Sequence, residues 1–163
     1  MKIAIGGDVV PAESNQQLFA EGRTDELFGK IPSLFEGADR VLVNLECALT
    51  HSDKPITKMG PNIKAIPESV AGIAKAGITD CFLSNNHSFD YGRMGLADTV
   101  EALKSAGIGY SGIGINDTDS RKPCIIEKDG MKIAVIAVCE HEYTYALPDR
   151  IGANPYDPYD TMA

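Results

Sequence analysis

The segment ITDCFLSNNHSFDYG (residues 78–92) decides most about how this chain folds. Its apolar part, residues 78–83, predicts a buried strand, and the pattern after Gly92 predicts a helix. Two amides, an imidazole and a carboxylate lie between the two, at Asn85, Asn86, His87 and Asp90. Because open α/β sheets bind ligands at the carboxyl ends of their strands, we expect the functional site in this turn.

Strand and helix patterns alternate on both sides of this segment. Apolar runs predict strands at residues 2–6, 40–45, 78–83, 108–113, 123–127 and 131–138, the last of them buried. Helical patterns lie at residues 16–35, 67–77 and 96–107. The Asp129-Gly130 dipeptide favours a tight hairpin, because both central residues of such a turn need positive φ. The order predicts one α/β domain over residues 1–163, with mostly parallel strands and one hairpin.

The composition is that of a soluble globular protein, with 44% hydrophobic and 23% charged residues. A net charge of −8 and scattered Lys and Arg argue against nucleic acid as a partner. No apolar stretch has the length of a membrane span or the form of a signal peptide. The four cysteines lack CxxC spacing, which favours reduced thiols over disulfides or zinc ligands. Together these features predict a cytoplasmic protein.

Polar side chains stand at the ends of three predicted strands. Asp8 follows the first strand, Asn44 and Glu46 end the second, and Asn85, Asn86 and His87 follow the third. Parallel strands lie about 4.8 Å apart, so these groups could converge at one edge of the sheet. Carboxylate, amide and imidazole groups suit a divalent metal. The alternative is that each merely caps a helix or forms a turn, and the recurrence at three strand ends favours the metal site.

The sequence leaves more than one role possible for Asp90 and for His141, and it also contains one long loop. Asp90 could accept a hydrogen bond from His87 or cap the next helix, and capping is the commoner role. His141 could reach a metal or a substrate, or be an ordinary loop histidine. Residues 51–66 form a polar loop with two prolines and a glycine, which is a candidate substrate-facing flap.

Three motifs now stand out: Gly7-Asp8, Asn44-Leu45-Glu46 and Asn85-Asn86-His87-Ser88-Phe89-Asp90-Tyr91-Gly92. Together they resemble the bacterial capsule-synthesis family, the CapA group linked to poly-γ-glutamate capsule production. The resemblance runs from residue 2 to about residue 142. This family looks like a branch of the calcineurin-like metallophosphoesterases. The resemblance therefore implies a two-sheet α/β sandwich with helices outside and a metal centre at the strand ends.

The resemblance also implies a role for each motif residue. Asp8 would be a metal ligand, and Glu46 would replace the carboxylate that bridges two metals. Asn86 would ligate through its side-chain oxygen. His87, supported by Asp90, would protonate the leaving oxygen as general acid. Further candidates for contact with substrate or metal are Asn44, Asn85 and His141. The implied cofactor is a divalent metal, as two ions of Mn, Fe, Zn or Mg.

The chain departs from the metallophosphoesterase pattern at several points. Val10 stands where a histidine usually follows the first aspartate, and Glu46 stands where aspartate is usual. The later histidines have no counterpart except His141. Family members are also longer, so we expect residues 1–163 to form the amino-terminal part of an incomplete domain.

Two functions follow from the resemblance. The first is metal-assisted hydrolysis or transfer at a phosphate ester in capsule synthesis, on a small molecule or polymer that carries phosphate or carboxylate. The second is a non-catalytic module that assists polyglutamate assembly or export by binding. The resemblance also leaves a surface-anchored location open beside the cytoplasmic one.

Overall fold

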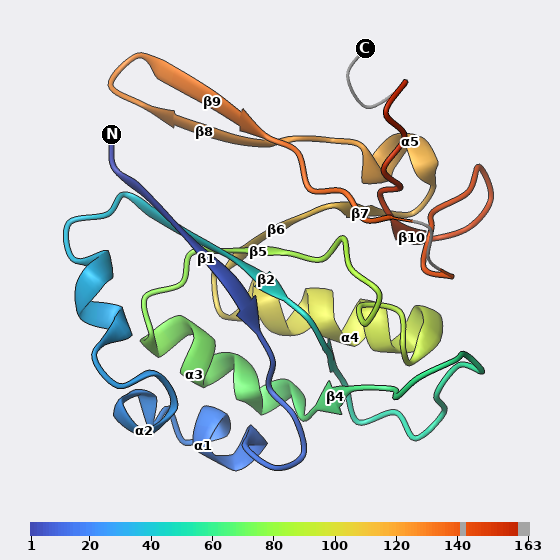
Figure 1. Cartoon of the computed structure of the whole chain (residues 1–163), viewed down its shortest axis with the longest axis horizontal. Coiled ribbons are helices and arrows are strands. Elements are labelled where there is room, and N and C mark those ends of the chain that lie inside the picture. Colours follow the sequence, from blue (N-terminus) through green and yellow to red (C-terminus); the bar gives the residue numbers. More distant parts are fainter. Residues whose placement is uncertain (141–142, 160–163) are drawn as a thin grey trace.

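A four-stranded sheet is the centre of the computed structural model, which describes residues 1–140 and 143–159 (Figure 1). Its strands, in spatial order, are β1 (Ile3–Val9), β2 (Arg40–Leu45), β5 (Asp80–Phe82) and β6 (Gly109–Ser111). All three neighbouring pairs are parallel. The structure thus confirms the predicted mixed α/β class with a mainly parallel central sheet, which is consistent with a metallophosphoesterase-like fold.

Most helices cover one face of this sheet, whereas the hairpin and the short helix α5 lie on the other side (Figure 1). The helical elements are α1 (Gln16–Ala20), α2 (Thr24–Phe28), η1 (Ile31–Phe35), η2 (Pro67–Ser69), α3 (Val70–Lys75), α4 (Gly92–Ser105) and α5 (Asp117–Ser120). The second predicted helix begins with a 3-10 turn at Pro67, because proline suits a first turn. It is followed by Gly77 at φ +82°, the left-handed conformation that ends helices.

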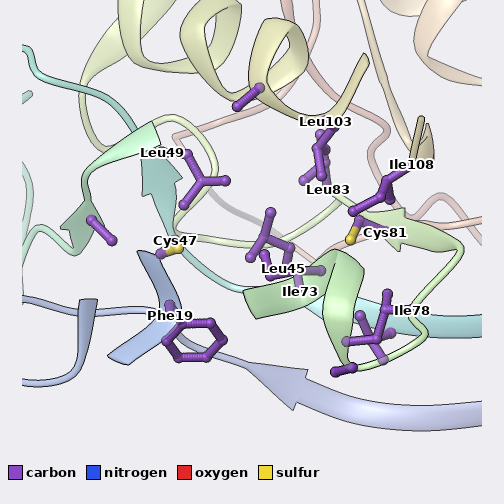
Figure 2. Packing of buried hydrophobic residues seen from close by; sticks show 14 of the residues in the cluster. Phe19, Leu45, Cys47, Leu49, Ile73, Ile78, Cys81, Leu83, Leu103 and Ile108 are labelled. Carbon is purple, nitrogen blue, oxygen red and sulfur yellow. The ribbon is translucent and has the colours of Figure 1, made fainter. Parts of the chain in front are cut away.

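The core lies between the sheet and the helices. Val41, Val43 and Leu45 alternate along β2 and belong to one cluster of buried side chains, while Leu42, also buried, is not part of that cluster. A strand buried on both faces is continuously apolar, as this one was predicted to be. Figure 2 shows the cluster, which also contains Phe19, Cys47, Leu49, Ile73, Ile78, Cys81, Leu83, Leu103 and Ile108.

Helix α1 packs closely on α3 at a glycine. A Cβ atom on Gly72 would lie 2.7 Å from the main-chain oxygen of Phe19 and 2.9 Å from its ring. Any side chain there would therefore push the two helices apart. The absence of a side chain at this position allows Phe19 to enter the core.

The hairpin of β8 (Cys124–Lys128) and β9 (Met131–Val135) turns as expected. Asp129 and Gly130 both have positive φ, at 52° and 76°. The strand predicted at residues 131–138 is present but ends at Val135, and the prediction that it is buried was wrong. Met131 and Ile133 are 48% and 40% exposed, because within residues 1–140 and 143–159 only β8 pairs with β9.

Short two-stranded pairs complete the fold: β3 (Ala48–Leu49) with β4 (Lys64–Ala65), and β7 (Ile113–Gly114) with β10 (Gly152–Ala153). The β3–β4 pair closes the base of the long loop at residues 51–63. The predicted strand at residues 108–113 is divided by Gly112, whose φ of +84° interrupts extended backbone.

Two of the cysteines confirm the thiol prediction. Cys47 and Cys81 are buried free thiols in the core. Burial raises the pKa of the Cys81 thiol to about 12, so it is protonated and unreactive near neutral pH. In the described part of the chain, the helices are too short and too polar for any of them to traverse a lipid bilayer.

Candidate functional site

The ends of three parallel strands meet at one edge of the sheet. Register places Asp8 beside Asn44, and Asn44 beside Phe82, three residues before Asn85. The Asn85 amide donates to Asn44 Oδ1 at 2.9 Å, and the Asn44 amide donates to Asp8 Oδ1 at 2.8 Å. A chain of hydrogen bonds thus joins β1, β2 and the turn after β5.

Asn85 folds that turn. Its Oδ1 accepts from the main-chain N–H of His87, from that of Ser88 and from the Ser88 hydroxyl, each at 3.0 Å. Its amide also donates to the carbonyl of Leu45 at 2.9 Å. Since its oxygen already accepts three hydrogen bonds, Asn85 serves the site by fixing the turn that carries His87.

His87 and Asp90 form a buried pair within this turn. His87 Nδ1 lies 2.7 Å from Asp90 Oδ2, and the Asp90 carboxylate is fully buried. An ionised carboxylate can only accept, so the geometry places the proton on Nδ1. His87 Nε2 is then the ring nitrogen that does not bond to Asp90 and remains available to accept or donate a proton.

The commoner role considered for Asp90, capping the next helix, was wrong. The N-cap of α4 is Tyr91, and no side chain makes a cap hydrogen bond there. Asp90 instead accepts the main-chain N–H of Ile63 at 2.6 Å in addition to His87. Asp90 therefore connects the turn after β5 to the long loop.

The same loop contributes Lys58, which sequence reasoning missed. The Lys58 ammonium forms an ion pair with Asp90 Oδ1 and donates to the main-chain carbonyl of Asn86 at 3.0 Å. The N–H of Ile56 donates to the carbonyl of Asp90 at 2.8 Å. The segment expected to be a flap is therefore fastened to the turn. Lys54, Lys58 and Lys64 all stand in it, and no local pattern distinguishes the buried one.

Glu46 and Asp8 provide the carboxylates. Glu46 directly follows β2, where its N–H donates to the carbonyl of Val9 at 3.1 Å. Its Oε1 lies 4.0 Å from His87 Nε2. Partial burial raises the pKa of Glu46, and the neighbouring Asp8 carboxylate raises it further, while His87 and Lys58 oppose the shift. Two carboxylates that repel each other at a strand edge are suited to share a cation.

The donor set fits a divalent ion in part. Asp8 and Glu46 are hard oxygen donors of the type that Mg²⁺ and Mn²⁺ prefer. Within residues 1–140 and 143–159, no three His, Cys, Asp or Glu side chains are grouped so as to hold a metal. The carboxylates thus suit one cation, and the pair of ions expected from the resemblance stays a prediction.

Asn86 and His141 are the remaining predicted site residues. Asn86 is half-buried, and its main-chain carbonyl accepts the Lys58 ammonium. His141 lies outside the described residues, so its role stays a prediction.

Glu46→Gln is expected to stabilise the metal-free protein at pH 7.5. A raised pKa in the folded state means that the folded state binds the Glu46 proton more tightly, so ionised Glu46 opposes folding above its folded pKa. The gain should vanish as pH falls toward 4.5, where wild-type Glu46 is protonated. Thermal unfolding from pH 4.5 to 7.5 measures this difference, and a gain that does not change with pH would contradict it.

Fold and site define a class: an α/β protein with carboxylates, amides and a histidine at the carboxyl edge of a parallel sheet. The chain belongs to the bacterial capsule synthesis protein family. The family model described as "Bacterial capsule synthesis protein PGA_cap" matches residues 2–160.

Curated relatives agree with this assignment. The chain is 30% identical over 157 residues to "Capsule biosynthesis protein CapA" of Bacillus anthracis, a match that covers 91% of this chain and 38% of that protein. It is 25% identical over 137 residues to "PGA biosynthesis protein CapA" of Bacillus subtilis, covering 80% and 35%. It is 32% identical over 88 residues to a "Probable polyglutamine synthesis accessory protein" of Mycobacterium tuberculosis, covering 54% and 23%. The chain thus spans well under half the length of these relatives.

Proposed function

We propose that this chain forms the strand-end half of a metal-dependent phosphoesterase-type site that acts in poly-γ-glutamate capsule synthesis. One observation carries the proposal: His87, oriented by Asp90, presents Nε2 to a carboxylate pair. A general acid beside a cation-binding pair is what transfer at a phosphate ester requires. The names of the relatives support the biosynthetic context.

Each residue of the site would have a role that follows from its position. Asp8 and Glu46 would hold a divalent cation, which when bound polarises a phosphoryl oxygen and offsets its charge. Asp90 accepts the Nδ1 proton of His87 and so fixes both the ring and its tautomer. A second proton, held at Nε2, is then the one His87 can give to a leaving oxygen. Asn85 and Asn44 keep the three strand ends in register.

A non-catalytic role in polymer assembly is the second candidate. The word "accessory" in the name of the mycobacterial relatives favours it. In this role the strand-end groups would bind a carboxylate-bearing polymer through a cation without turnover.

Metal-dependent stabilisation of this chain tests the proposal. Mn²⁺ at 100 times its dissociation constant should raise the stability by about 2.7 kcal/mol, which is roughly 5–10 °C in the unfolding midpoint. Asp8→Asn should abolish the shift, because it removes one of the two anionic donors. The matched control is Asp53→Asn, since the Asp53 side chain is 94% exposed in the loop.

Activity then separates the two candidates. Mn²⁺-dependent release of an aryl alcohol from its phosphate ester by the whole protein would support the phosphoesterase. A metal shift without turnover would favour the accessory role. No shift with Mn²⁺, Mg²⁺ or Zn²⁺ would contradict the metal site altogether.

A further inference from the structure

An apolar cavity of about 140 Å³ lies directly beside Asp8, next to the proposed cation site. One wall is the end of β1, including Gly6, Gly7 and Asp8. The other walls are hydrophobic side chains from α2, η1, β2 and the end of α3, namely Phe28, Ile31, Phe35, Val43, Ala76 and Ile78. Among the described residues that line the cavity, Asp8 has the only polar side chain. The cavity therefore has an apolar interior and a carboxylate at its edge.

The local sequence of β1 produces this cavity. Ile5 pairs with Leu42 and Asp8 pairs with Asn44, so β1 contains one residue more than β2 between the two pairs. Such a bulge redirects the side chains that follow it. The bulged residues are glycines, and a Cβ atom on Gly6 would lie only 3.2 Å from Val43 Cγ1. The bulge thus brings Asp8 to the edge of a space that no β1 side chain fills.

The inner walls of the cavity are fixed and its rim is accessible. Val43 and Ile78 belong to the buried core cluster. The Phe28 ring packs edge-to-face on Phe19, with ring centroids 5.6 Å apart and planes at 86°. Because these side chains are packed on their other sides, they cannot move to fill the cavity without disturbing the core. Ile31, in contrast, is 51% exposed, so a ligand can reach the cavity past it.

We infer that this cavity is a subsite for an apolar group of the substrate, about the size of one aromatic ring. An apolar cavity of this volume is large enough for a benzene ring but not for a strand or a helix. Phe28 and Phe35 in its walls favour a ring, because aromatic pairs gain from edge-to-face contacts.

The position beside Asp8 defines the class of substrate. A cation held by Asp8 and Glu46 would bind the phosphate of an ester while the cavity holds its apolar substituent. The substrate class is therefore a phosphate ester of an aromatic or similarly compact apolar alcohol. The role of the phosphate rests on the proposed function, whereas the binding of an apolar group by the cavity does not.

The experiment compares phenylphosphonate with methylphosphonate, which have no ester bond to hydrolyse, by isothermal titration calorimetry with Mn²⁺. Phenylphosphonate should bind at least about 10-fold more tightly, because its ring leaves water for an apolar surface. Ile31→Ser should reduce this preference by about 3-fold or more, because it removes part of the apolar wall. The matched control is Leu34→Ser. Leu34 lies in the same η1 turn, is 72% exposed and does not line the cavity, so the preference should stay that of wild type.

Two further ligands test the cavity itself. Benzene, added without metal, should shift the methyl resonances of Ile31 and Ile78 in a ¹³C-methyl spectrum of the wild type. 3-Methylbutylphosphonate carries a branched alkyl group instead of a ring and should bind less tightly than phenylphosphonate. Tighter binding of the alkyl compound would still support an apolar subsite, and would assign it to an alkyl ester rather than an aryl ester.

The outcomes separate the subsite from the proposed function. Metal-dependent binding of both phosphonates with equal affinity, or a phenyl preference that Ile31→Ser leaves intact, would overturn the subsite and leave the metal site standing. Benzene binding without any phenyl preference would overturn it too, and would assign the cavity to an apolar side chain of a partner. Benzene shifts at Ile31 and Ile78 without binding of either phosphonate would support an apolar ligand site and contradict the proposed function.

Discussion

Asp90→Ala is expected to lower the free energy of unfolding by about 3–5 kcal/mol. The carboxylate is fully buried, and its removal takes the countercharge from the Lys58 ammonium and the acceptor from two donors, the Nδ1–H of His87 and the N–H of Ile63. The two donors would have to stay buried without an acceptor, and the ammonium without a countercharge, unless the loop opened to water. Urea unfolding monitored by circular dichroism gives the value directly.

Two further variants identify the cause of the loss. Asp90→Asn keeps an oxygen that can accept the Ile63 N–H but removes the charge, so its loss should lie between those of wild type and Asp90→Ala. Asp53→Ala removes an exposed carboxylate that pairs with Lys64, and should change stability by less than about 0.5 kcal/mol. A loss below about 1 kcal/mol in Asp90→Ala would show that the buried network does not stabilise the fold.

The fold could be predicted where burial is a local property of the chain. The predicted bounds of β2 match the structure, because a continuous apolar run buried on both faces has few other solutions. The Asp129-Gly130 turn could be predicted as well, because these two residues themselves favour the positive φ that the turn requires. The prediction that β9 is buried was wrong for the opposite reason. Whether a strand is covered depends on elements that are distant in the sequence, and the apolar pattern of the strand does not show whether such elements pack on it.

The site shows the same division between local and distant information. The approach of Asp8 to Asn44 and Asn85 follows from parallel strands that end at one edge. The role of Asp90 was harder to predict, because a polar residue just before a helix usually caps it. Only the folded turn shows that His87 is the partner of Asp90. Lys58 could not be identified, because its position results from the path of an irregular loop rather than from any periodic pattern.

His87→Gln is expected to reduce turnover of an aryl phosphate by the whole protein by roughly 10²–10⁴-fold, if the proposed phosphoesterase activity is correct. Glutamine has a similar size and can still bond to Asp90, so the turn should remain folded. It cannot, however, hold and release a proton near neutral pH, which is the role assigned to Nε2. The measurement is kcat at saturating Mn²⁺, with His51→Gln as control because that side chain is 66% exposed.

The metal response of the same variant decides how the rate loss is interpreted. His87 Nε2 lies 4.0 Å from Glu46 Oε1, close enough for the ring to be either a proton donor or a metal ligand. If His87 is the general acid, His87→Gln should keep the Mn²⁺-induced rise in unfolding midpoint while losing activity. If the rise disappears with the activity, His87 is a ligand, and the proton must come from another group. An unchanged rate would remove His87 from the chemistry and leave Asp90 as its structural partner only.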